Sequence, residues 1–129
     1  AKPVHSLEEI TKLKALFPDN IRQFNVYEKG VLVAGTTIFE AANVAHSQYI
    51  SGKEEKNELG GLDLLHYHLL TEVYKEKKFF DFGISNEEQG KKLNEGLIFW
   101  KESFGTNVII QDFYEVETNN FQMLDNVII

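Results

Sequence analysis

The pattern of apolar and polar positions predicts a helix near the start of the chain. Apolar side chains recur at helical spacing from Leu7 to Phe17. Ser6 precedes this stretch and Glu8 and Glu9 lie within its first turn, an arrangement typical of a helix N-terminus. Pro18, followed by an aspartate and an asparagine, predicts that the helix ends there and that the chain turns.

Three segments of β-forming residues follow this helix, at 21–27, 31–39 and 44–51. The first turn between them contains Gly30, a residue that adopts positive φ at little cost. Gly35 interrupts the second segment and indicates a bulge or a close backbone approach. The pattern predicts a meander of three antiparallel strands.

The second half of the chain alternates between helical and strand patterns. A charged loop at 52–61 leads into the strongest helical pattern, at 62–75, which has leucines along one face. The elements expected after it are a strand at 79–84, a polar loop at 85–92, a helix at 93–104 and a strand at 107–117. This order predicts an α+β fold, with a mixed sheet and helices on both of its faces.

Size and composition favour one domain. With 129 residues, 43% of them hydrophobic, the chain can bury a core, and we expect residues 1–118 to form it. Residues 119–129 are expected to be a tail or an added edge strand. The net charge of -7 argues against nonspecific binding to nucleic acid.

The residue types that are missing exclude several kinds of chemistry. The chain has no cysteine, so it has no disulfide, thiolate metal site or cysteine nucleophile, and it fits a reducing, cytoplasmic compartment. No apolar run approaches the roughly 20 residues that a membrane-spanning helix needs.

The loop at 53–61 is the first candidate for chemistry. It ends in Gly60 and Gly61 at the expected start of a helix, where unpaired backbone N–H groups attract phosphate. Lys53 and Lys56 add positive charge, whereas three glutamates in the same loop oppose an anion. The alternative interpretation is a solvated connection without a ligand.

Two polar residues lie in apolar company and form a second candidate. Asp81 stands between two phenylalanines of the expected strand, and its carboxylate is either a general base or a structural partner of the following loop. Lys101 follows Phe99 and Trp100 and lies seven residues after Asn94, hence on the same face of the expected helix. This lysine either stabilises a developing anion or covers aromatic surface with its aliphatic stem.

The histidines give weaker signals. His66 and His68 are two residues apart and so face different ways on a helix, which disfavours a shared metal site. We therefore expect no bound metal. His46 lies on the third expected strand and is the histidine that we expect to face a cleft.

Three segments carry a resemblance to a known family: GLDLLHYHLL (61–70), FFDFGIS (79–85) and NEGLIFWKESFG (94–105). With the order of the expected elements, the chain resembles the GNAT acyltransferase superfamily, and more closely its FemAB-like branch, from about residue 20 to residue 117. The resemblance implies a GNAT-like mixed sheet. It also implies transfer of an acetyl or aminoacyl group to an amine acceptor.

The resemblance assigns roles to particular residues. Acetyl-CoA would be the donor, held by backbone around Ile50, Ser51, Gly60, Gly61 and Leu62. In the FemAB-like branch, an aminoacyl-tRNA would be the donor instead.

The same resemblance places the reaction centre at Lys101, which would stabilise the developing charge, with Asp81 and Asn94 orienting groups in the cleft. The alternative function is a catalytically silent, GNAT-like binding or partner module of a larger protein. A second domain in tandem, or a homodimer formed through the sheet edge near 126–129, is a further expectation.

Overall fold

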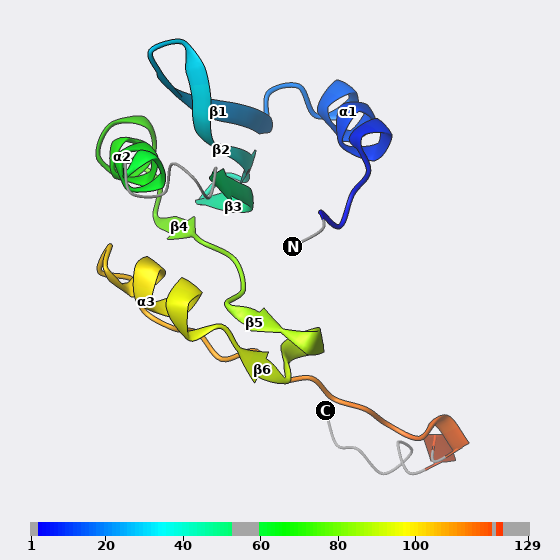
Figure 1. Cartoon of the computed structure of the whole chain (residues 1–129). Coiled ribbons are helices and arrows are strands. Elements are labelled where there is room, and N and C mark those ends of the chain that lie inside the picture. Colours follow the sequence, from blue (N-terminus) through cyan, green and yellow to red (C-terminus); the bar gives the residue numbers. More distant parts are fainter. Residues whose placement is uncertain (1–2, 53–59, 120, 123–129) are drawn as a thin grey trace.

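The computed structural model describes residues 3–52, 60–119 and 121–122 (Figure 1). Its elements, in chain order, are α1 (Leu7–Leu16), β1 (Ile21–Glu28), β2 (Val31–Glu40), β3 (Val44–Gly52), α2 (Gly61–His68), a π-helical turn (Leu69–Val73), β4 (Phe79–Asp81), β5 (Asn86–Glu87), a 3₁₀ turn (Glu88–Gly90), β6 (Lys92–Leu93) and α3 (Glu95–Glu102). No helix within these described ranges is long and apolar enough to cross a membrane.

The main sheet has the strand order β1-β2-β3-β4. The first three strands pair antiparallel, whereas β4 pairs parallel with β3, so the sheet is mixed as predicted. Lys29 and Gly30, both with positive φ, form the tight turn between β1 and β2. The Ser6 hydroxyl and the Glu9 carboxylate exchange hydrogen bonds with each other's backbone N–H, which caps α1.

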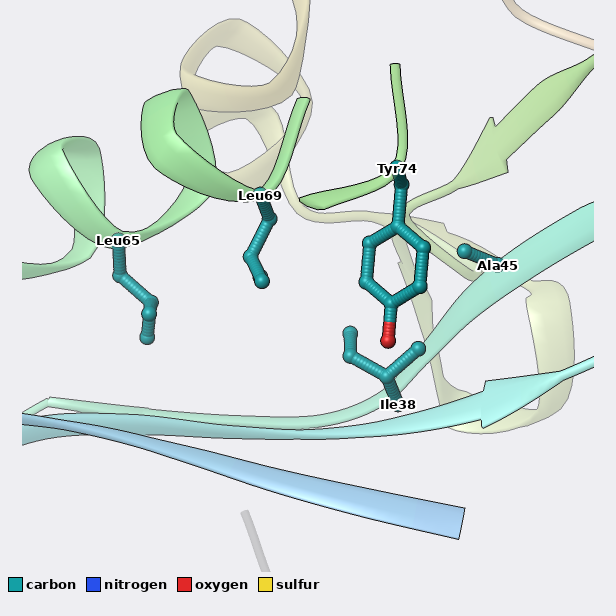
Figure 2. Packing of buried hydrophobic residues seen from close by; sticks show 5 residues of the cluster. All are labelled: Ile38, Ala45, Leu65, Leu69 and Tyr74. Atoms are coloured by element: carbon teal, nitrogen blue, oxygen red, sulfur yellow. The ribbon is translucent and has the colours of Figure 1, made fainter. Parts of the chain in front are cut away.

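Helix α2 covers one face of the sheet, and the core lies beneath it. Leu65 and Leu69 of the helical segment pack with Ile38 of β2, Ala45 of β3 and Tyr74 (Figure 2). Successive residues of a strand point to opposite faces. Phe39, which follows Ile38 on β2, therefore faces the other side of the sheet. Helix α1 lies on that side (Figure 1). Helices thus cover both faces, as the sequence predicts.

Gly35 marks a close approach. A Cβ at this position would lie 2.8 Å from the Asn25 side-chain oxygen. Strand β2 also carries a bulge two residues earlier, at Val33, because Val26 pairs with Ala34 and Tyr27 pairs with Leu32. The break in register between β2 and β3 lies further along, where Thr37 pairs with Tyr49 and Ile38 pairs with Ser47. The residue between those two partners, Gln48, is the extra one, so β3 carries a bulge near its centre.

The predicted helix at 62–75 ends early and in an unusual way. It is α-helical to His68 and then continues as one π-helical turn to Val73. The Tyr74 N–H donates to the Leu69 carbonyl over 2.8 Å, five residues back instead of four. This wide turn brings the Tyr74 ring over the sheet, where its hydroxyl donates to Glu40 over 2.7 Å.

Several sequence predictions in the second half are wrong. The expected strand at 79–84 contains only three paired residues, and the polar loop at 85–92 forms a small hairpin of β5 and β6. Residues 107–117, predicted as a strand, pair with no strand in the described part of the chain. Phe99 of α3 is 74% exposed, so its ring contributes little to the core. The tail edge expected at 126–129 lies outside the described residues.

Candidate functional site

The parallel pairing of β3 and β4 is short, and this shapes the site. It joins three residue pairs, from Val44 with Phe79 to His46 with Asp81. Gly83, with a φ of +71°, then turns the chain out of the sheet towards β5 (Figure 1). The second half of β3 therefore has a paired neighbour on only one side, β2, among the described residues.

His46 and Asp81 meet at the point where the pairing ends. The His46 Nδ1 and the Asp81 Oδ2 lie 2.8 Å apart, and the other ring nitrogen lies 3.1 Å from the Gln48 side-chain oxygen. The second oxygen of Asp81 accepts a hydrogen bond from the Gly83 N–H over 2.7 Å. The bulge at Gln48 thus lies directly beside this pair.

The Asp81 carboxylate is held in its charged form. Partial burial by itself raises the pKa of this carboxyl group. The hydrogen bonds from the Gly83 N–H and His46, with the charges of His46 and Lys101, outweigh burial and lower its pKa below the ordinary value. The sequence leaves two roles open for Asp81, a general base or a structural partner of the following loop. The hydrogen bond that it accepts from the Gly83 N–H fits the structural role.

Lys101 is buried and bonded to backbone. Its Nζ donates to the carbonyl oxygens of Gly83 and Ile84 over 2.9 and 2.6 Å, so it ties α3 to the chain that leaves β4. Burial lowers the pKa of this lysine, and the charge of Asp81 acts in the opposite direction. Lys101 and Asp81 therefore share one neighbourhood, around Gly83.

Asn94 has a different position from the one predicted. It is the N-cap of α3 rather than a residue inside the helix, and its side-chain oxygen accepts from the Leu97 N–H over 2.9 Å. Its amide group donates to Glu87 of the hairpin over 2.8 Å. Asparagine prefers this capping position because it satisfies an unpaired N–H. These contacts are to α3 and the hairpin, and none is to Asp81 or Lys101.

The residues expected to hold a donor gather at one end of the sheet. Ser51 pairs with Gly35, and a Cβ on Gly61 would lie 3.3 Å from the Ala34 Cβ, next to Gly35. Helix α2 starts there without a side-chain cap, after Gly60 with a φ of +61°. Ile50 and Leu62 flank this end and are half-buried. The rest of the predicted phosphate loop, 53–59, lies outside the described residues.

A groove of about 320 Å³ opens on the α1 face of the sheet, and His46 lines one part of it. Its other walls are mostly apolar, from Leu13 of α1 and Phe17, which caps the end of α1, to Phe39 and Val44 of the sheet. Its lining residues are Leu13, Phe17, Asn20, Ile21, Phe39, Glu40, Ala41, Val44 and His46. The groove confirms that His46 faces a cleft.

A histidine in the aromatic core is the feature that sequence reasoning missed. His66 of α2 is fully buried, and its ring lies between 5.0 and 6.2 Å from four aromatic rings: Phe80, Phe82, Trp100 and Phe104. Its Nδ1 lies 2.9 Å from the Leu62 carbonyl, whereas Nε2 is buried without a hydrogen-bond partner. Burial lowers the pKa of this imidazole. The four aromatic residues, in the segments 80–82 and 100–104, are a signal that a ring on α2 faces them.

The described residues contain no group of His, Asp and Glu side chains that could hold a metal ion. His66 is buried while His68 is exposed, in line with the predicted divergence of the two side chains.

Comparison with known proteins supports the fold. No family model matches the sequence, and no curated protein matches it. Among solved structures, AAC(6')-Iy in complex with the bisubstrate analogue CoA-S-monomethyl-acetylneamine is similar with a TM-score of 0.65 and 11% identity, over 89% of this chain and 82% of that one. The integron cassette protein VCH_CASS6 from the mobile metagenome of V. cholerae has a TM-score of 0.51 and 15% identity, over 84% and 68%.

These likenesses confirm the predicted GNAT-like α+β fold. At such identities they establish the fold alone. The FemAB-like branch gains no support from them.

Proposed function

We propose that this protein is an acyltransferase of the GNAT type, which transfers an acetyl group from acetyl-CoA to an amine. The observation that carries the proposal is the early end of the β3–β4 pairing after His46 and Asp81. Among the described residues no strand pairs with the second half of β3 on that side, so its backbone groups there would be available to an extended ligand. The similarity in fold to AAC(6')-Iy, whose structure holds a CoA-containing analogue, points the same way.

The distance between the two ends of β3 fits a long donor. Five residues separate Ser51 from His46 along the strand, which at roughly 3.3 Å per residue is about 16 Å. Phosphate groups at the uncapped start of α2 would interact with free N–H groups there. The pantetheine arm of CoA would then reach along β3 to the His46–Asp81 pair. Ile50, Ser51, Gly60, Gly61 and Leu62 are the residues that we propose for donor binding.

The reaction needs a proton acceptor and stabilisation of negative charge. The amine nitrogen attacks the thioester carbonyl, the C–N bond forms, the C–S bond breaks, and CoA leaves as a thiolate. We assign removal of the amine proton to the Nε2 of neutral His46, which would leave the Gln48 side-chain oxygen to accept a hydrogen bond from that proton, while Nδ1–H stays on Asp81 and orients the ring. The ammonium of Lys101 uses two of its three N–H donors on backbone carbonyls, and the third remains for the developing oxyanion. Asn94 acts from outside this centre, because it fixes the start of α3, the helix that carries Lys101.

The groove lined by His46 is the proposed acceptor site. Its walls are mostly apolar, so it suits an amine on an apolar body. Glu40 lies in the same lining, and the net charge of -7 favours the approach of a cation.

Two alternatives remain within the proposal. An aminoacyl-tRNA could replace acetyl-CoA as the donor, as in the FemAB-like branch. The second candidate function is a catalytically silent GNAT-like module that binds a partner, a second domain in tandem or another copy of itself. The backbone bonds of Lys101 favour this candidate, because they give the lysine a structural role without any reaction.

Thermal unfolding with acetyl-CoA separates these alternatives. A ligand at 100 times its Kd stabilises the folded state by about 2.7 kcal/mol, which raises the Tm of a domain this size by on the order of 10 °C. No shift at millimolar acetyl-CoA would refute the proposed donor and leave the aminoacyl-tRNA and the silent module. An aminoacyl-tRNA that does raise the Tm would then select the first of these.

Thiol release measures turnover directly, because the chain has no cysteine to react with the reagent. With an accepted amine, His46→Gln is expected to lose on the order of 100-fold in kcat while the Tm shift with acetyl-CoA persists. His68→Gln, at an exposed position, is the matched control and should keep full turnover. A Tm shift without thiol release from any amine would support the silent module.

A further inference from the structure

The groove on the α1 face of the sheet has an apolar floor with an imidazole at its edge. Ile21 of β1 pairs with Phe39 of β2, and Phe39 pairs with His46 of β3. Directly paired residues of antiparallel strands point to the same face, so these three side chains stand in one row across the sheet. Leu13 of α1 and Phe17, which caps the end of α1, line the same groove from the helix. A ligand beside His46 therefore lies between apolar groups of the sheet and of the helix.

The volume of the groove suits a small apolar body. It is about 320 Å³, at the low end of the range for ligand pockets, roughly 300–1,000 Å³. A short alkyl chain or one aromatic ring fits within such a volume. Each methylene that such a body removes from water strengthens binding by about 4-fold. Affinity is therefore expected to come from the apolar body and to rise with its length until the groove is filled.

Glu40 is the one lining residue with a full charge at neutral pH, among those that the structure describes, and its carboxylate faces away from the groove. Glu40 follows Phe39 on β2, so its side chain points to the opposite face of the sheet. There the carboxylate accepts hydrogen bonds from the Tyr74 hydroxyl over 2.7 Å and from Arg22 over 3.3 Å. The Lys77 ammonium lies 3.9 Å from its other oxygen. Two cations therefore already compensate this single negative charge.

The two ends of a bound diamine would meet different surroundings. One amine would lie beside His46, whose side chain is 32% exposed and keeps contact with water. An ammonium at the far end of an alkyl chain would lie against the apolar floor, where it would lose its hydration without gaining a counter-charge. A methyl group at the same place has no such cost. The net charge of -7 attracts every cation from a distance, but salt screens this attraction beyond about 8 Å.

We propose that this groove selects primary amines that carry a single cationic group on a small apolar body, and that it excludes diamines and polyamines. The inference rests on the proposed acyl transfer for the statement that the bound amine is the acceptor. The preference itself follows from the lining: an apolar floor, apolar helix residues above it, and a carboxylate that is turned to the other face of the sheet.

Two amines of equal length test the preference on the unmodified chain. Hexylamine and 1,5-diaminopentane differ only at the far end, where a methyl group replaces an ammonium. Calorimetric titration at about 0.15 M salt, with and without CoA, gives their dissociation constants. Hexylamine is expected to bind more tightly by on the order of 100-fold. Affinity should also rise by about 4-fold per methylene from propylamine to hexylamine. Equal binding of the two amines, tighter binding of the diamine, or no binding of either at millimolar concentration would overturn the inference.

A carboxylate introduced into the groove should reverse the preference. Phe17→Glu changes a lining residue that is 51% exposed, a position that tolerates a polar side chain. It is expected to weaken hexylamine and strengthen 1,5-diaminopentane, so that the ratio of their dissociation constants changes by at least about 10-fold. Leu16→Glu is the matched control, because it adds the same charge at the neighbouring position, 62% exposed and outside the lining. The same change of ratio in both variants would show that long-range charge selects the amine, against the inference.

Thiol release from acetyl-CoA separates this inference from the proposed function. Release with 1,5-diaminopentane as fast as with hexylamine would support acyl transfer and overturn the selectivity. Selective binding of hexylamine without any thiol release would overturn acyl transfer and support the selectivity of the groove. Release with hexylamine alone is the expected result.

Discussion

His66 gives this fold a dependence on pH that can be isolated by mutation. Its ring is fully buried, Nε2 has no hydrogen-bond partner, and burial lowers its pKa below the ordinary value of 6.5. The unfolded chain binds a proton at pH values near 6.5, while the folded chain still excludes it. Between the lowered pKa and about 6.5, the unfolded state therefore carries more protons, and stability falls as the pH falls.

The magnitude follows from proton linkage. Within that window the free energy of unfolding contributed by His66 falls by at most about 1.36 kcal/mol per pH unit, and below the folded pKa it stays at its lower value. Above about pH 6.5 the contribution is fully present. In His66→Phe this component is absent, because phenylalanine does not titrate. The larger ring adds a packing cost of about 1–3 kcal/mol, but this cost is the same at every pH.

The assay is urea unfolding between pH 8 and pH 5, at one protein concentration, for wild type and His66→Phe. Trp100 is the single tryptophan and its ring lies 5.0 Å from that of His66, so its fluorescence reports on this cluster. Relative to wild type, the variant should gain stability as the pH falls below 6.5. His68→Phe, two residues further along and exposed, should follow wild type. A difference between His66→Phe and wild type that stays constant over the whole range would refute the reasoning.

Three other substitutions test the packing and hydrogen bonds that stabilise the fold around the site. Leu69→Ala, at a fully buried position, should lower the free energy of unfolding by about 2–5 kcal/mol, measured by urea denaturation. Ser6→Ala removes one half of the reciprocal bond with Glu9 and should cost about 1 kcal/mol and the first turn of α1, seen in faster amide exchange. Tyr74→Phe loses a bond to the carboxylate of Glu40 and should cost about 1.5 kcal/mol, because Glu40 keeps its cationic partners; a neutral result would show that the hydroxyl bond contributes nothing.

Local signals in the sequence predicted the first half of the fold well. The cap at Ser6, the proline at the end of α1 and the glycine turn between β1 and β2 each act within a few residues, and all three are confirmed. The segment 107–117 has an equally clear strand pattern, but a strand needs a partner edge. That edge depends on distant parts of the structure, which a periodicity does not reveal.

The prediction of the site is limited in the same way, because contacts between distant parts of the chain decide its geometry. Seven-residue spacing correctly relates two positions on a helix, yet Asn94 lies one residue before α3 begins and caps it instead. The resemblance did place Asp81 and Lys101 in one neighbourhood, and the bonds of Lys101 to the carbonyls of Gly83 and Ile84 account for it. It did not show that Lys101 would be buried against backbone carbonyls, or that His66 would be enclosed by rings from the segments 80–82 and 100–104.

The π-helical turn at Leu69–Val73 makes chain length, as well as side-chain identity, a condition of this core. An α-helix turns by about 100° per residue, so an ordinary turn here, one residue shorter, would rotate the following chain by that angle. Tyr74 would then leave the sheet, and Glu40 would lose its hydroxyl partner. Single-residue deletions are commonly tolerated in surface loops, but in this turn a deletion would act as severely as the loss of a core side chain. Homologous sequences that keep the tyrosine should therefore also keep the spacing between it and Leu65.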